Sequence, residues 1–113
     1  MPRLYSTEKI LMYVGNDKDQ CHEMVDLFLD TIPPEIENLS KAVFSKDWNL
    51  AYEISHRIKP SIEIMQIENS WELFSEFDTK LSQRIDLDTI NDLYMEILKG
   101  LKLAISQIKE DYK

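Results

Sequence analysis

The residues of this chain best suited to chemistry are His56 and Lys59, three positions apart in the segment AYEISHRIKPSIEIMQI. On a helix of about 100° per residue, Ile54, Ile58 and Met65 lie nearly opposite His56, so His56 faces solvent. Lys59 projects from the same face one turn further along, where its ammonium can meet a charge placed on the imidazole. The pattern predicts an exposed, neutral nucleophile with a cation beside it.

Several other residues of the segment share this face. Arg57 adds a second cation, and the two cations predict a small positive spot on an otherwise acidic protein. Further neighbours lie within about 60° of His56 on the helical projection. The expected partner-binding surface consists of Tyr52, Glu53, Arg57, Pro60 and Glu63. The alternative is that His56 is an exposed helical histidine without a role.

Composition limits the classes of function. A chain of 113 residues matches one small domain, so residues 1–113 are expected to share one core. The net charge of −8 repels phosphate backbones and the basic residues are scattered, which argues against a nucleic-acid partner. There is no apolar run of membrane-spanning length and no signal-peptide core, so we expect no direct membrane insertion.

The lone Cys21 cannot form an internal disulfide and offers no cysteine pair for zinc. It therefore favours a reducing compartment, and we expect a cytoplasmic monomer. His22 lies beside Cys21, but adjacent helical residues point about 100° apart, so a metal site there is not expected. The carboxylate pairs Glu35 with Glu37 and Glu72 with Glu76 are interpreted as solvated faces, because the chain has no Glu-x-x-His pair.

The elements that must position His56 are helices, since the chain has only two glycines and four prolines. A short helix is expected from a cap at Ser6 to about Val14, ended by Gly15. Asp17 caps the next helix, which either bends at Pro33 and Pro34 or divides there into two. Its apolar stripe is Cys21, Val25, Phe28, Ile32, Ile36, Leu39 and Val43.

Three further helices complete the expected fold. Asp47 caps the helix that carries His56 and ends at about Gln66, and Asn69 marks the next start. That next helix has an expected inner face of Trp71, Phe74, Phe77 and Leu81. The last helix follows Asp86 or Asp88 and has a seam of Ile90, Tyr94, Ile97, Leu101, Ala104 and Ile108. The predicted fold is all-α: an antiparallel four-helix bundle with a short extra N-terminal helix.

The run His56-x-x-Lys59-x-Ser61, with a long helix before it and two helices after it, resembles the histidine-containing phosphotransfer (HPt) domain of bacterial phosphorelays. In that family the motif reads His, two residues, Lys, Gly, then Ser or Ala, on the exposed side of a four-helix bundle. The resemblance covers helix number and order from about Asp17 onward. The upstream stretch FLDTIPPEIENLSKAVFSKDW is also similar to the family's helix that enters the motif.

The resemblance implies that His56 carries a phosphoryl group and that Lys59 steadies it. The implied partner is a response-regulator receiver domain, which supplies the acceptor aspartate and magnesium, and a hybrid sensor histidine kinase is a second possible partner. No cofactor of the chain's own is implied. Neither Gly15 nor Gly100 belongs to a Gly-rich phosphate loop, so we expect a phosphocarrier without ATP-dependent kinase activity rather than an enzyme.

The sequence departs from the family at Pro60, where the family has Gly, and at Gln66-Ile67, where a Gly-Ala pair is common. Pro60 lacks the N–H that would bond the carbonyl of His56, so the helix is expected to bend beneath His56. This bend either reshapes the active face or only curves the helix around the core. Two functions remain open: a His-Asp phosphotransfer module, or a non-catalytic helical adaptor that binds its partner without phosphate.

Overall fold

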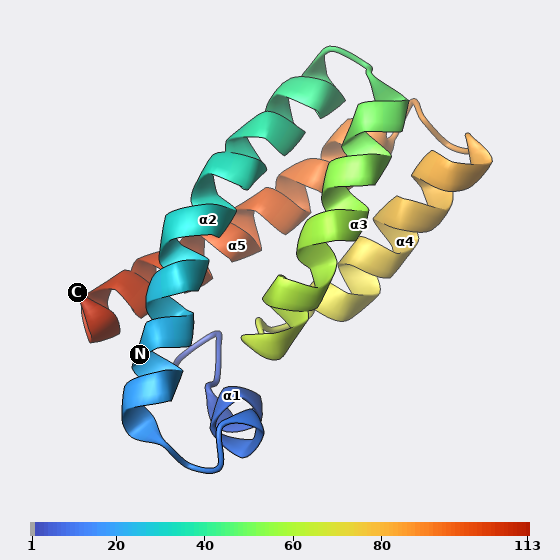
Figure 1. Ribbon diagram of the computed structural model, residues 1–113. Coiled ribbons are helices and arrows are strands. Elements are labelled where there is room, and N and C mark those ends of the chain that lie inside the picture. The colour runs from blue at the N-terminus through green and yellow to red at the C-terminus, as the bar shows by residue number, and fades with distance from the viewer. Residues whose placement is uncertain (1) are drawn as a thin grey trace.

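The computed structural model describes residues 2–113, which form five helices. They are α1 (Glu8–Tyr13), α2 (Lys18–Phe44), α3 (Trp48–Ile64), α4 (Ser70–Gln83) and α5 (Ile90–Tyr112). Helices α2 to α5 run alternately up and down, and α1 lies across the end of the bundle at which α2 begins (Figure 1). α3 packs against α2 and α4, and α5 closes the bundle by packing against both α4 and α2. The predicted all-α antiparallel bundle with a short extra N-terminal helix is confirmed.

The core contains the apolar stripes expected from the sequence. Every residue of the predicted α2 stripe is buried, and so is the whole predicted seam of α5. On α4, Phe74, Phe77 and Leu81 are buried, but Trp71 is 52% exposed, so its assignment to the inner face was wrong. At about 100° per residue, Trp71 points about 90° away from the mean direction of the other three, which places it at the edge of the α3–α4 seam.

The prolines do not interrupt either helix that contains them. α2 is a single helix through Pro33 and Pro34, so the interpretation with two separate helices was wrong. α3 likewise continues through Pro60 to Ile64. The bend expected beneath His56 stays a prediction.

Most of the expected helix starts are where the capping pattern put them. The carboxylate of Asp17 accepts the backbone N–H groups of Asp19 and Gln20, and that of Asp47 accepts the N–H of Leu50. Asn69 precedes α4 in a left-handed conformation, with φ of 63°, and makes no side-chain cap. α5 is preceded by Thr89 rather than by Asp86 or Asp88.

The start of α1 also differs slightly from the expected one. The residue before α1 is Thr7, and Ser6 accepts the N–H of Glu8 at 3.2 Å through its hydroxyl. Gly15 has a φ of +61°, the left-handed conformation expected of the residue that ends α1. Among residues 2–113, no helix combines the length and the apolar character needed to cross a membrane.

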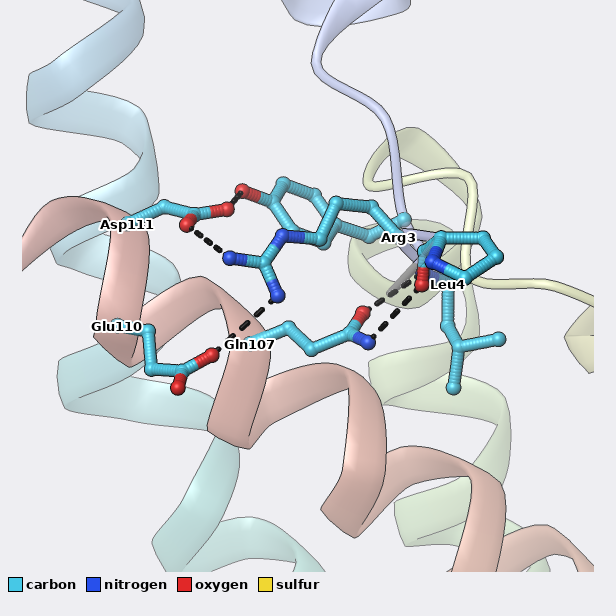
Figure 2. Close-up of polar contacts among 7 residues, drawn as sticks. Arg3, Leu4, Gln107, Glu110 and Asp111 are labelled. Carbon is cyan, nitrogen blue, oxygen red and sulfur yellow. Dashed lines mark hydrogen bonds and ion pairs between the residues drawn. The ribbon is translucent and has the colours of Figure 1, made fainter.

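The segment before α1 is tied to the last turns of α5 (Figure 2). The buried amide of Gln107 accepts the backbone N–H of Leu4 at 2.7 Å and donates to the carbonyl of Pro2 at 3.2 Å. Arg3 pairs with Glu110 at 3.3 Å and with Asp111 at 2.6 Å. Residues 2–6, called the clasp below, are thus held against the last turns of α5.

The clasp also reaches the connection between α3 and α4. The N–H of Ser6 donates to the carbonyl of Met65 at 2.9 Å, and the N–H of Glu68 donates to the carbonyl of Leu4 at 2.8 Å. These bonds satisfy backbone groups of a loop that has no partner strand. The loop that follows α3 is therefore held by the clasp, nine or more residues beyond His56.

Candidate functional site

His56 occupies the middle of α3 and is exposed, as its helical phase predicted. The residues behind it, Ile54, Ile58 and Met65, are buried against the other helices. One turn earlier, the ring of Tyr52 stacks on the imidazole, with centroids 5.6 Å apart and planes inclined by 19°. The stack leaves the imidazole at the surface and limits its rotation from one side.

Lys59 lies on the α4 side of His56 and is held by three groups of α4. Its Nζ donates to the hydroxyl of Ser75 at 3.0 Å and lies 4.2 Å from the centroid of the Trp71 ring. The carboxylate of Asp78 is 3.9 Å away. The Lys59 side chain is only 18% exposed, so its ammonium is docked against α4 rather than free in solvent beside His56.

Asp78 is a largely buried carboxylate at the interface between α3 and α4. Its Oδ1 accepts the hydroxyl of Ser55 at 2.5 Å, and Ser55 is completely buried. Burial raises the pKa of Asp78, against the opposing effects of the Ser55 hydrogen bond and of the nearby Lys59 and His56 side chains. Asp78 is therefore electrostatically connected to both residues that the sequence assigned to the chemistry.

Arg57 lies on the opposite side of His56 and contacts α2. Its Nε and Nη2 donate to the same carboxylate oxygen of Glu35, at 2.8 and 2.5 Å. The hydrogen bond from Arg57 is the largest cause of the lowered pKa of Glu35. Glu35 is thus an ion-pair partner of Arg57 in an exposed part of the α2–α3 interface.

The remaining residues of the expected partner surface divide into two groups. Glu53 and Pro60 are exposed close to His56 on α3. Glu63 is half-buried and pairs with Lys9 of α1, with 3.6 Å between Nζ and Oε1. Tyr52 is half-buried under its stack with His56.

The small positive spot expected around His56 is not present as predicted. Lys59 and Arg57 are both near His56 in the chain, but each contacts a carboxylate on a neighbouring helix, Asp78 and Glu35 respectively. The expectation failed because it counted only charges of α3. The charges of α2 and α4 that pack beside it compensate both cations.

Sequence reasoning missed Ser75 and Asp78, and it assigned Trp71 to the core. These three residues are spaced by four and three positions, so they form a second stripe on α4 beside the apolar one. Its members Ser75 and Asp78 were readable as polar positions that flank the α3–α4 seam. Its partner was not readable, because nothing local to α4 indicates which neighbouring residue it meets.

Comparisons with known proteins agree with this arrangement at the level of the fold. Neither models of protein families nor curated proteins gave a match to the sequence. Among solved structures, the chain is similar to the crystal structure of the HPt domain of a sensor hybrid histidine kinase from Shewanella, with a TM-score of 0.79 and 17% sequence identity. The match covers 93% of this chain and 90% of that one. The bundle is therefore an HPt-like fold.

Proposed function

We propose that this chain is a histidine phosphotransfer module, which accepts a phosphoryl group on His56 and exchanges it with the aspartate of a receiver domain. The observation that carries the proposal is the exposed imidazole in the middle of α3 of an HPt-like bundle, with Lys59 one turn further along. In this role the chain is a phosphocarrier that works on a cytoplasmic receiver or hybrid sensor kinase. It needs no nucleotide site of its own.

The transfer step needs little from the chain itself. A lone pair of the neutral imidazole attacks phosphorus, and the P–N bond forms while the P–O bond to the receiver's aspartate breaks. The electron pair of the broken bond stays on the leaving carboxylate. We expect the receiver to supply magnesium, whereas this chain presents the nucleophile, orients it with Tyr52 and supplies the ammonium of Lys59.

The test is incubation with a panel of phosphorylated receiver domains. Acid-labile, base-stable phosphate should appear on the parent chain and be absent from the His56→Gln variant. His22→Gln is the matched control, because His22 is also an exposed histidine, on α2. Labelling that survives in His56→Gln, or that never occurs with any receiver, would contradict the proposal.

A second candidate is a non-catalytic adaptor that binds a signalling partner through the same face without phosphate. The observation that favours it is the pairing of both nearby cations with carboxylates, which leaves little uncompensated positive charge for a phosphoryl group. Pro60 beside the nucleophile is a second departure from the phosphotransfer motif. Receiver binding that is unchanged by His56→Gln, without any labelling of the parent, would select this candidate.

A further inference from the structure

Asp78 links the residues on both sides of His56 in α3. Its Oδ1 accepts the hydroxyl of Ser55, which precedes His56, and its Oδ2 lies 3.9 Å from Nζ of Lys59, which follows it. The Asp78 side chain is 13% exposed and reaches this position from α4. A carboxylate in such a place interacts with whatever charge His56 carries.

We propose that Asp78 is a positioning residue that holds Lys59 on α4 while His56 is unmodified, and that competes with the phosphoryl group for Lys59 once His56 is phosphorylated. This inference rests on the proposed function. It assigns to Asp78 a role in setting how readily His56 gives its phosphoryl group back to a receiver. Asp78 itself exchanges no atom in the transfer.

Phosphorylation of His56 would change the charge balance between α3 and α4. Without phosphate, Lys59 and Asp78 compensate each other, and Ser75 and Trp71 complete the contacts of the ammonium. A phosphoryl group brings between one and two further negative charges, about −1.5 to −2 in the well-studied phosphorylated side chains. One lysine cannot compensate both that group and Asp78. The two anions therefore repel each other across a partly desolvated interface, where charges are weakly screened.

Asp78 destabilises the phosphorylated form relative to the unmodified form, so it shifts the exchange equilibrium toward the receiver aspartate. A purely structural carboxylate would change the free energy of unfolding without changing this equilibrium. The equilibrium therefore distinguishes the two roles.

The first experiment measures the ratio of phosphorylated to free His56 at equilibrium with a phosphorylated receiver, in a His22→Gln background. Asp78→Asn removes the charge and keeps an oxygen that can accept the Ser55 hydroxyl. We expect the ratio to rise about fivefold or more. The matched control is Glu76→Gln, because Glu76 is an exposed carboxylate of α4 that pairs with Lys80, and it should leave the ratio unchanged. An unchanged or lower ratio in Asp78→Asn, or an equal rise in the control, would overturn the inference.

The second experiment requires neither a receiver nor a variant at Asp78. Trp71 touches Lys59, so in a Trp48→Phe background its emission reports whether the ammonium stays on the ring. After chemical phosphorylation of His56 with phosphoramidate, the emission should change, and it should not change in the same way in Lys59→Ala. Identical responses would show that Lys59 does not move, which sinks the inference. Absence of labelling by every receiver would instead count against the proposed function alone.

Discussion

The guanidinium of Arg57 is bound to the carboxylate of Glu35 across the α2–α3 interface, with 2.5 Å between Nη2 and Oε2. Arg57 directly follows His56 in the chain, so this ion pair fixes the backbone next to the proposed nucleophile to the neighbouring helix. Pro34 precedes Glu35, and the apolar stripe of α2 continues on both sides of it. Glu35 therefore faces α3 because α2 keeps its helical phase through Pro33 and Pro34.

Arg57→Ala should return the pKa of Glu35 toward its ordinary value near 4.5, because the hydrogen bond that lowers it is lost. The lowered pKa means that the pair stabilises the fold above that ordinary value and loses its contribution as the pH falls through the folded-state pKa. The stabilisation near neutral pH should be about 1 kcal/mol or less, since Arg57 is half exposed. NMR titration of Glu35 in the parent and in Arg57→Ala checks this, and the exposed Glu37 serves as the internal control. An unchanged pKa of Glu35 would show that Arg57 does not form the ion pair.

His56→Gln should abolish phosphoryl acceptance and change the free energy of unfolding by no more than about 1 kcal/mol. The side chain is exposed, and only its stack with Tyr52 is lost. Phosphate labelling and urea unfolding of the same samples measure the two effects separately. A loss of several kcal/mol would mean that the imidazole contributes to the core, contrary to its exposure here.

Lys59→Ala should slow phosphotransfer or shorten the phosphohistidine lifetime by about tenfold or more, and weaken receiver binding much less. The reason is that Lys59 is assigned to charge that exists only with the phosphoryl group, and loss of one such donor costs up to about 10³-fold in preorganised sites. Rapid-quench transfer rates and a binding titration with unphosphorylated receiver give the two quantities. Equal losses in both would assign Lys59 to docking.

Pro60→Ala restores the backbone donor to the carbonyl of His56 and should stabilise α3, by up to about 3 kcal/mol on propensity alone. If the proline shapes the active face, this variant transfers more slowly with its own receiver. Pro60→Gly gives the unfolded chain more freedom and is the less stable of the two variants. If both variants transferred phosphoryl groups at the rate of the parent chain, Pro60 would be shown to be tolerated and to have no part in the mechanism.

Gln66→Gly should raise the free energy of unfolding by about 0.5–1 kcal/mol. Gln66 has a φ of 50°, and the strain of a left-handed non-glycine residue, about 1–2 kcal/mol, exceeds the added freedom of glycine in the unfolded chain. The gain is reduced by loss of the 3.2 Å hydrogen bond from the N–H of Lys9 to Oε1 of Gln66. Chemical denaturation measures it, and Glu96→Gly on an exposed helical position should instead lower stability by about 1 kcal/mol.

The helices and the core were readable from the sequence because both depend on local periodicity. The stripe of α2 survived its prolines, and the left-handed Gly15 ended α1 as expected. The exposure of His56 followed from the same periodicity. Trp71 was assigned wrongly because an aromatic residue beside the apolar stripe was counted as part of that stripe.

The electrostatics of the site were not readable, because they depend on which helices become neighbours. Lys59 pairs with Asp78, which lies nineteen positions later in the chain, and Arg57 pairs with Glu35, which lies twenty-two positions earlier. Such pairs are set by the crossing of whole helices, to which every core residue contributes. The sequence around Lys59 does not show that Asp78 becomes its partner, whereas the spacing of Lys59 from His56 is local and visible.

The clasp between residues 2–6 and the last turns of α5 brings the two chain ends to one end of the bundle (Figure 1). A short peptide linker between them would therefore bridge little distance, and new ends could open in the exposed connection between α4 and α5. The same geometry suits insertion of the whole bundle into a surface loop of another protein. His56 lies in the middle of α3, whereas the clasp contacts α5 and the loop that follows α3.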